Sequence, residues 1–195
     1  MQKIYLAGPD VFLKEGIRKT LVPAIKHICR VNGFDPLFPL DNIVERIDID
    51  GNNGRLTKLD HAQRIRAANI AMIKDADIIL ADISPFRGTG PDAGTIYEVA
   101  YANALGKPVI LYTCDPRPYL DRCAGDTSYS EVQEGLEDSD GMLVEDFGLV
   151  DNLMFAAFCP VVQFFEDALR LAILAKSHFK DGVWDNDFLK KNLAG

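Results

Sequence analysis

Histidine and cysteine, two of the side chains that most often bind transition metals, are scarce in this 195-residue sequence. The chain has three histidines and four cysteines, and no two cysteines have CxxC spacing. Scattered cysteines of this kind are typical of inert thiols rather than zinc ligands. The shortage of histidine also argues against a nucleophile activated by a histidine base. We therefore expect no metal site.

Positive charge is in short supply as well. Lys and Arg number 21 against 29 Asp and Glu, which gives a net charge of −8. A groove for nucleic acid needs a basic stripe, so nucleic acid is excluded as a partner. No apolar run approaches the roughly 18 residues of a membrane span, which excludes a membrane partner. The first residues, MQKIYLAGPDVF, are typical of a strand and a turn rather than a secretory leader, and we expect a cytoplasmic protein.

Two common nucleotide-binding motifs are also missing. The glycine-rich segment GTGPDAG at 88–94 lacks the lysine of a P-loop, and its glycines do not form a G-x-G-x-x-G fingerprint. Residues 77–112 around it nevertheless predict a strand, a loop, a helix and a second strand, with Gly106 at the end of the helix. Such a unit implies a right-handed crossover in a parallel sheet. Ligands of such sheets bind outside the carboxyl ends of the strands, so this loop is the predicted active site.

The rest of the chain completes an α/β pattern. We expect a strand at 3–7, an extended segment at 34–40 and a short strand at 161–162. Helices are expected from about Asp10 to 31, with a kink at Pro23, and over 62–74 and 164–175. The whole chain, 1–195, is predicted to be one domain, an α/β sandwich with about five parallel strands.

Three segments fall outside this pattern. Residues near 45–62 and 115–142 are predicted to be insertions, and the second is expected to be a solvated surface segment. The tail, 176–195, is polar except for four large apolar side chains that need burial, for which a neighbouring subunit is one candidate. These four are Val183, Trp184, Phe188 and Leu189.

Two carboxylates flank the start of the helix in the predicted active site. Residues 95–98 (TIYE) match a capping box, in which Glu98 would only satisfy the backbone at the start of its own helix. Alternatively, Glu98 is kept ionised by the helix dipole and attacks an anomeric carbon. Asp92 would then be its hydrogen-bond partner or a proton donor. Retaining glycoside chemistry requires two carboxyl groups about 5–5.5 Å apart.

Five further residues are candidates for substrate binding. Asp82 follows a strand and either faces the site or caps the next turn, and Asp41 forms either an Asx turn or a pocket wall. Tyr5 and Phe12 belong to the core or stack on a base. Gly8 ends the first strand at the same edge of the sheet.

Several segments together resemble one enzyme family. They are KIYLAGPDVF at the start, PLDN at 39–42, ADISPFRGTGPDAGTIYEVAYANALGKPV at 81–109 and DNLM at 151–154. This set is similar to the nucleoside 2-deoxyribosyltransferases, and most similar to the purine-type branch. The resemblance implies a flavodoxin-like three-layer sandwich that cleaves the N-glycosidic bond of a 2′-deoxynucleoside.

The resemblance also implies roles for individual residues. Glu98 takes the place of the family's nucleophile, Asp92 that of its sugar-binding aspartate, and Tyr5 that of its aromatic residue at a strand end. Asn152 takes the place of an asparagine that reaches into the neighbouring subunit's site, which implies dimers or larger homo-oligomers with shared sites. Asn69 stands where some members have an aspartate.

The sequence differs from the family pattern at a second position, because Ile43 stands where some members have a glutamine. Both departures affect recognition of the base and its protonation as it leaves. With Phe12, Ile43 is expected to line the base pocket.

The function predicted from these residues is transfer of 2-deoxyribose between purine bases, with pyrimidines as further candidates. A deoxyribosyl-Glu98 intermediate would give retention of configuration, and no cofactor is needed. One alternative is a hydrolase of nucleosides or their 5′-monophosphates. Another is a non-catalytic nucleotide-binding module in which Glu98 serves only as a helix cap.

Overall fold

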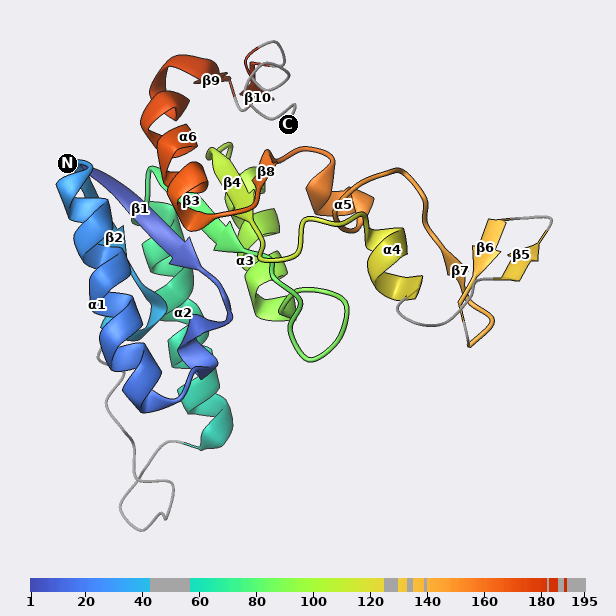
Figure 1. Cartoon of the computed structure of the whole chain (residues 1–195). Coiled ribbons are helices and arrows are strands. Elements are labelled where there is room, and N and C mark those ends of the chain that lie inside the picture. Colours follow the sequence, from blue (N-terminus) through green and yellow to red (C-terminus); the bar gives the residue numbers. More distant parts are fainter. Residues whose placement is uncertain are drawn as a thin grey trace.

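The structure, a computed structural model, describes residues 1–42, 57–124, 130–132, 135–138, 140–181, 183–185 and 188. Its centre is a sheet of five strands in the order β2-β1-β3-β4-β8, with every neighbouring pair parallel (Figure 1). This confirms the flavodoxin-like fold class. The strands are β1 (Gln2–Ala7), β2 (Phe34–Leu37), β3 (Ile78–Asp82), β4 (Val109–Tyr112) and β8 (Val161–Val162).

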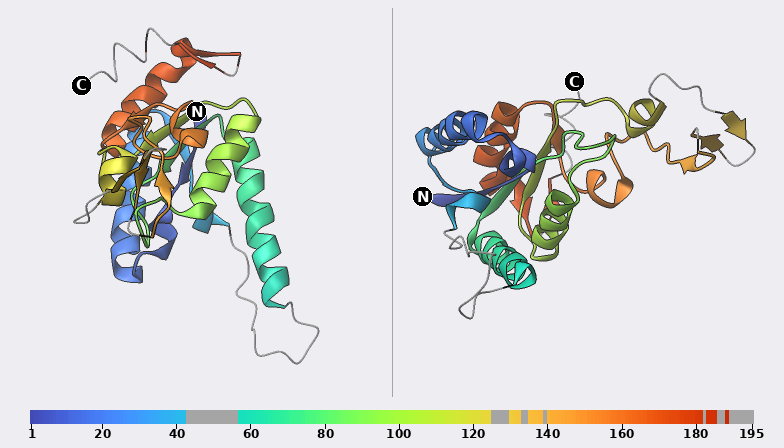
Figure 2. Two further views of the ribbon diagram at one scale, coloured as in Figure 1. Left: turned by 90° about the vertical axis from the view of Figure 1, so that its right-hand side faces the viewer. Right: turned by 90° about the horizontal axis from the view of Figure 1, so that it is seen from below.

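Two helices cover each face of the sheet (Figure 2). Helices α1 (Glu15–Val31) and α6 (Phe165–His178) pack on one face, and α2 (Lys58–Asp75) and α3 (Ala93–Ala104) on the other. In β3, Ile78 and Leu80 join the first core and Ile79 and Ala81 the second. Because both faces are buried, the strands read as continuous apolar runs.

The first predicted helix is divided in two. A 3-10 helix, η1 (Pro9–Phe12), follows β1, and α1 begins only at Glu15. Pro23 lies within α1 without ending it. A second 3-10 helix, η2 (Pro39–Asp41), follows β2.

Helix α2 begins earlier than its apolar pattern predicts. Thr57 caps it, because Asp60 N–H donates to the Thr57 hydroxyl and Thr57 N–H donates to the Asp60 carboxylate, a reciprocal capping box. Part of the insertion expected near 45–62 is therefore regular helix. Residues 43–56, with Ile43, lie outside the described residues.

The segment expected to be a solvated insertion at 115–142 contains structure of its own. It includes α4 (Tyr119–Ala124), β5 (Ser130–Val132) and β6 (Gly135–Glu137), and β6 pairs with β7 (Leu143–Val144). This small antiparallel sheet lies beside the sandwich, and α5 (Leu153–Ala156) follows it (Figure 1). Arg122, in α4, is only 6% exposed, so the expectation of a wholly solvated segment is wrong at this residue.

The C-terminal tail folds onto its own chain. Strands β9 (Phe179–Lys180) and β10 (Val183–Trp184) form an antiparallel pair after α6. Trp184 and Phe188 are buried in the core beside α6, so these two side chains need no neighbouring subunit, whereas Val183 stays exposed. Leu189 lies outside the described residues. Across the described chain, every helix is too short or too polar to span a membrane.

Candidate active site

A cavity of about 340 Å³ opens at the carboxyl ends of the first strands, where the loop after β1 meets the start of α3. Both acidic candidates, Asp92 and Glu98, line it, and so do Gly8 and Phe12 from the chain after β1. Its other lining residues are Val11, Pro39, Leu40, Ile65, Asn69, Gly94 and Thr95. The cavity therefore joins acidic groups at one side to apolar walls at the other.

Glu98 is held by side chains from two other elements. Its Oε1 accepts a hydrogen bond from the Tyr5 hydroxyl of β1 at 2.7 Å and one from Nδ2 of Asn69, in α2, at 3.3 Å. Tyr5 is fully buried, so its hydroxyl has a fixed place from which to donate. Both bonds go to the same oxygen, and Oε2 has no hydrogen bond from the described residues.

Burial raises the pKa of Glu98 to about 7 from an ordinary 4.5. The hydrogen bonds from Tyr5 and Asn69 oppose this shift, and the negative charge of Asp92 adds to it. The expectation that the helix dipole keeps Glu98 ionised needs correction. Glu98 lies in the second turn of α3, beyond the first turn where the dipole acts, and burial raises its pKa.

Asp92 caps the helix, a role that the sequence pattern offered to residues 95–98. Its Oδ2 accepts hydrogen bonds from Thr95 N–H at 2.9 Å and from the Thr95 hydroxyl at 3.1 Å. The capping-box interpretation of Glu98 is therefore wrong, because α3 begins at Ala93. Oδ1 of Asp92 has no hydrogen bond with the described residues and belongs to a side chain that lines the cavity.

Gly8 and Asp82 touch at the ends of β1 and β3. A Cβ at Gly8 would stand 3.0 Å from Cβ of Asp82, so only glycine allows this approach. Asp82 caps the following turn, since its Oδ1 accepts from Ser84 N–H at 2.8 Å. Burial raises the pKa of Asp82. Asp82 does not line the cavity that contains Glu98.

Phe12 is an exposed residue of the cavity wall and packs against two residues of the loop after β3. Its ring stacks on Phe86 with centroids 5.3 Å apart. The guanidinium of Arg87 lies over both rings, 5.3 Å from the centre of Phe12 and 4.7 Å from that of Phe86.

Two other candidates lie elsewhere. The Asp41 carboxylate accepts hydrogen bonds from Lys26 at 2.6 Å and Phe38 N–H at 3.0 Å. It lines a groove beside α1 that shares Leu40 with the Glu98 cavity, and it does not line that cavity itself. Asn152 is exposed and caps α5 by accepting from Met154 N–H at 3.0 Å. Asn152 does not line the Glu98 cavity of its own chain.

Comparison with known proteins identifies the family. The family model of nucleoside 2-deoxyribosyltransferases matches residues 4–154, which include every site residue described above. The chain belongs to this family. It is 33% identical to a solved 2-desoxiribosyltransferase from Leishmania mexicana, over 89% of this chain and 98% of that one, with a TM-score of 0.68.

Two further similarities are more distant. An uncharacterized protein of Schizosaccharomyces pombe, C191.05c, is 29% identical over 170 residues, which are 80% of this chain and 75% of that protein. A conserved protein from Enterococcus faecalis V583 shares the fold, with a TM-score of 0.53 at 22% identity, over 90% of this chain and 99% of that one.

In this deoxyribosyltransferase-family site, α2 supplies contacts that sequence reasoning did not assign. The contact of Asn69 with Glu98 was missed, although Asn69 had been recognised as a departure from some relatives. Oδ1 of Asn69 is buried and has no hydrogen-bond partner among the described residues. Ile65 stands one helical turn earlier, on the same side of α2. The spacing of four between Ile65 and Asn69 indicates that the two side chains share one face of α2. No local sequence pattern indicates that this face packs against α3.

A second cavity, of about 400 Å³, adjoins the first. The two share Ile65, Asn69, Gly94 and Glu98. The second is otherwise lined by Ala62, Arg66, Ile70 and Tyr97. The described residues contain no cluster of three or more His, Cys, Asp or Glu side chains that could hold a metal ion.

Proposed function

We propose that this protein is a nucleoside 2-deoxyribosyltransferase that moves 2-deoxyribose between bases, purines above all, through an ester on Glu98. One observation carries the proposal: a half-buried glutamate lines an open cavity, with one oxygen held by Tyr5 and Asn69 and the other without a hydrogen bond from the described residues. Family membership supports the reaction class. The name of the Leishmania mexicana relative supports transfer.

The reaction requires two displacements at C1′. Oε2 of ionised Glu98 attacks C1′, the N-glycosidic bond breaks, and its electron pair leaves with the base, which takes up a proton. A second base then attacks C1′, the ester bond breaks, the Glu98 carboxylate is restored, and the incoming base loses a proton. Two inversions give net retention.

The other cavity residues position the substrate. Oδ1 of Asp92 accepts a hydrogen bond from a sugar hydroxyl, while Oδ2 stays bound to Thr95. Phe12 stacks on the base, and Leu40 supplies an apolar wall. With a pKa near 7, part of the Glu98 population is ionised at neutral pH and ready to attack.

Replacing Glu98 with alanine tests the nucleophile. With deoxyinosine as donor and adenine as acceptor, we expect E98A to lose transfer by at least about 10³-fold, with unchanged circular dichroism. Mass spectrometry of wild-type enzyme quenched with donor alone is expected to show a deoxyribosyl adduct on the peptide that contains Glu98. Glu15→Ala, at an exposed site on α1, is the matched control. Normal transfer by E98A would refute the mechanism.

Arg87 favours a second candidate function, hydrolysis of a nucleoside 5′-monophosphate. Its guanidinium lies over the ring of Phe12, a residue that lines the cavity, and has no ion pair with the described residues. A cation in this place suits a phosphate. Release of base from deoxyadenosine 5′-monophosphate without any acceptor would support hydrolysis, whereas release that requires an acceptor base supports transfer.

A purely structural role for Glu98 has no support. The non-catalytic hypothesis requires its carboxylate to point back to the backbone near Thr95. Instead, Asp92 accepts from Thr95 and Glu98 accepts from Tyr5.

A further inference from the structure

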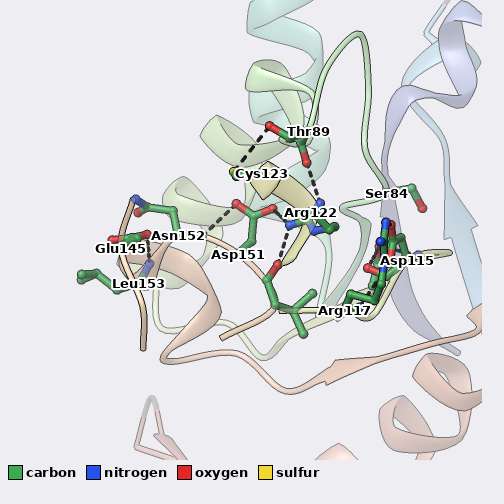
Figure 3. A network of polar contacts seen from close by, with 12 residues as sticks. Ser84, Thr89, Asp115, Arg117, Arg122, Cys123, Glu145, Asp151, Asn152 and Leu153 are labelled. Carbon is green, nitrogen blue, oxygen red and sulfur yellow. Dashed lines mark hydrogen bonds and ion pairs between the residues drawn. The ribbon is translucent and has the colours of Figure 1, made fainter. Parts of the chain in front are cut away.

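Arg122 connects three parts of the chain that are far apart in sequence (Figure 3). From α4, its Nη1 donates to the carbonyl oxygen of Thr89 at 2.6 Å, in the glycine-rich loop. Its Nη2 donates to the carbonyl oxygen of Val150 and to Oδ2 of Asp151, both in the segment before α5. The side chains of Arg122 and Asp151 are only 2% and 3% exposed.

This buried pair lies next to two predicted site residues. Thr89 is three positions before Asp92, which lines the Glu98 cavity and caps α3. Asp151 immediately precedes Asn152 and accepts the Asn152 N–H at 2.8 Å through Oδ1. The planar guanidinium fork can bind acceptors on both sides at once, which a lysine ammonium on a flexible stem does not reproduce.

We propose that Arg122 and Asp151 are positioning residues for the active site. By holding the carbonyl of Thr89, Arg122 fixes the glycine-rich loop near its start and thereby the place of Asp92. By holding Asp151, it fixes the start of α5 and thereby Asn152. The link to sugar binding rests on the proposed function of Asp92. The segment 115–142 therefore serves the active site through α4.

A buried ion pair also affects stability, so the test must separate the two effects. Removing Arg122 alone leaves Asp151 buried without its partner, which destabilises the fold. The double variant R122M/D151N removes both charges and leaves no unpaired charge inside, so it is expected to stay folded at assay temperature. R122K keeps the charge but lacks the fork.

Kinetics distinguish positioning from stability. A smaller folded fraction lowers the apparent kcat and leaves KM unchanged. A displaced Asp92 weakens sugar binding, so we expect R122M/D151N and R122K to raise the KM for deoxyinosine at least about tenfold, with a smaller fall in kcat. The control is R117M, which breaks the exposed bidentate pair of Arg117 with Asp115 on the same segment and is expected to keep the wild-type KM.

A second readout does not depend on activity. The Thr95 N–H bonded to Asp92 and the Phe86 N–H bonded to the Gly90 carbonyl are expected to exchange with deuterium faster in R122M/D151N, with β3 unchanged. Wild-type KM together with wild-type exchange in that variant would overturn the proposal. If the wild-type enzyme shows no transfer, the proposed function fails, and exchange alone then decides whether the pair fixes the loop.

Discussion

The Glu98 carboxyl group is subject to opposing influences, of which burial is the largest. Burial favours the neutral acid, whereas hydrogen bonds from Tyr5 and Asn69 favour the carboxylate. The balance, a pKa of about 7, leaves both forms populated at neutral pH. A less solvated carboxylate is also a stronger nucleophile, so the same burial that limits the ionised fraction activates each ionised group.

Removing the Tyr5 hydroxyl is expected to change this balance in one direction. Tyr5→Phe deletes a donor that lowers the pKa of Glu98, so that pKa rises further above 7. Because attack needs the carboxylate, the acidic limb of the pH profile of kcat moves to higher pH, by about one unit for one lost hydrogen bond. Transfer rates from pH 5 to 9 measure the shift. An acidic limb at or below its wild-type position would contradict this account.

The sequence showed some of these residues more clearly than others. Glu98 and Asp92 stand out because a glycine-rich loop runs into an apolar helix at a predicted strand end. Asn69 bonds to Glu98 across 29 positions, a contact set by how α2 packs on α3 rather than by any local pattern. The position of Asp41 outside the Glu98 cavity likewise depends on its hydrogen bonds, which come from Lys26 and from Phe38 N–H at the start of η2.

The start of α3 shows how one element assigns roles to two carboxylates. Asp92 and Thr95 are both good N-cap residues, and they stand three positions apart. Capping by Asp92 adds Ala93, Gly94 and Thr95 to the helix and places Glu98 in its second turn. There the side chain meets β1 and α2 instead of the helix terminus. The sequence pattern indicated a cap only at Thr95, whereas the structure uses Asp92.

At the ends of β1 and β3, a methyl group is expected to test the close contact. Gly8→Ala places a Cβ 3.0 Å from that of Asp82, at a φ of 156° that side chains rarely adopt. We expect a loss of about 1–3 kcal/mol in the free energy of unfolding, measured with urea. We also expect weaker donor binding, because Gly8 lines the cavity.

Gly16→Ala is the matched control for this substitution. Gly16 is in α1 with nothing within 4 Å of the added Cβ, so alanine is expected to stabilise the helix by about 0.5–1 kcal/mol. Equal effects at the two positions would show that contact with Asp82 does not matter.

Some helices and strands could be predicted from the sequence more readily than others. The central strands were predictable because burial on both faces leaves uninterrupted apolar runs such as residues 78–81 of β3. The first turn of α2 was missed because its residues are polar and its start is fixed by the Thr57 cap. The strands β5 to β7 have two or three residues each, too few for a period to show.

Across the whole molecule, acidic groups with raised pKa values gather at one end of the sheet. Burial raises the pKa of Asp10, Asp82 and Glu98 alike. Each binds its proton more tightly in the folded state than in the unfolded chain. The stabilising contribution of these three groups is therefore complete where they are protonated, and it is lost as pH rises and they ionise. An ionisable active site thus lowers global stability at the pH where it works.

Comparing wild type with E98Q isolates the share of Glu98 in this loss. Its folded pKa of about 7 exceeds the ordinary value of 4.5, so its stabilising effect is complete below pH 4.5 and is lost between 4.5 and 7. Glutamine does not titrate, so the free energy of unfolding of E98Q minus that of wild type is expected to increase from pH 4.5 to 8. The pKa shift of Glu98 from 4.5 to about 7 corresponds to a change of about 3 kcal/mol at most in this free-energy difference. Urea unfolding of both proteins at both pH values measures it, and Asp10 and Asp82 cancel because both proteins contain them. A difference that stays constant with pH would place the Glu98 carboxyl group in contact with water, where it could not be the partly protonated nucleophile proposed for this site.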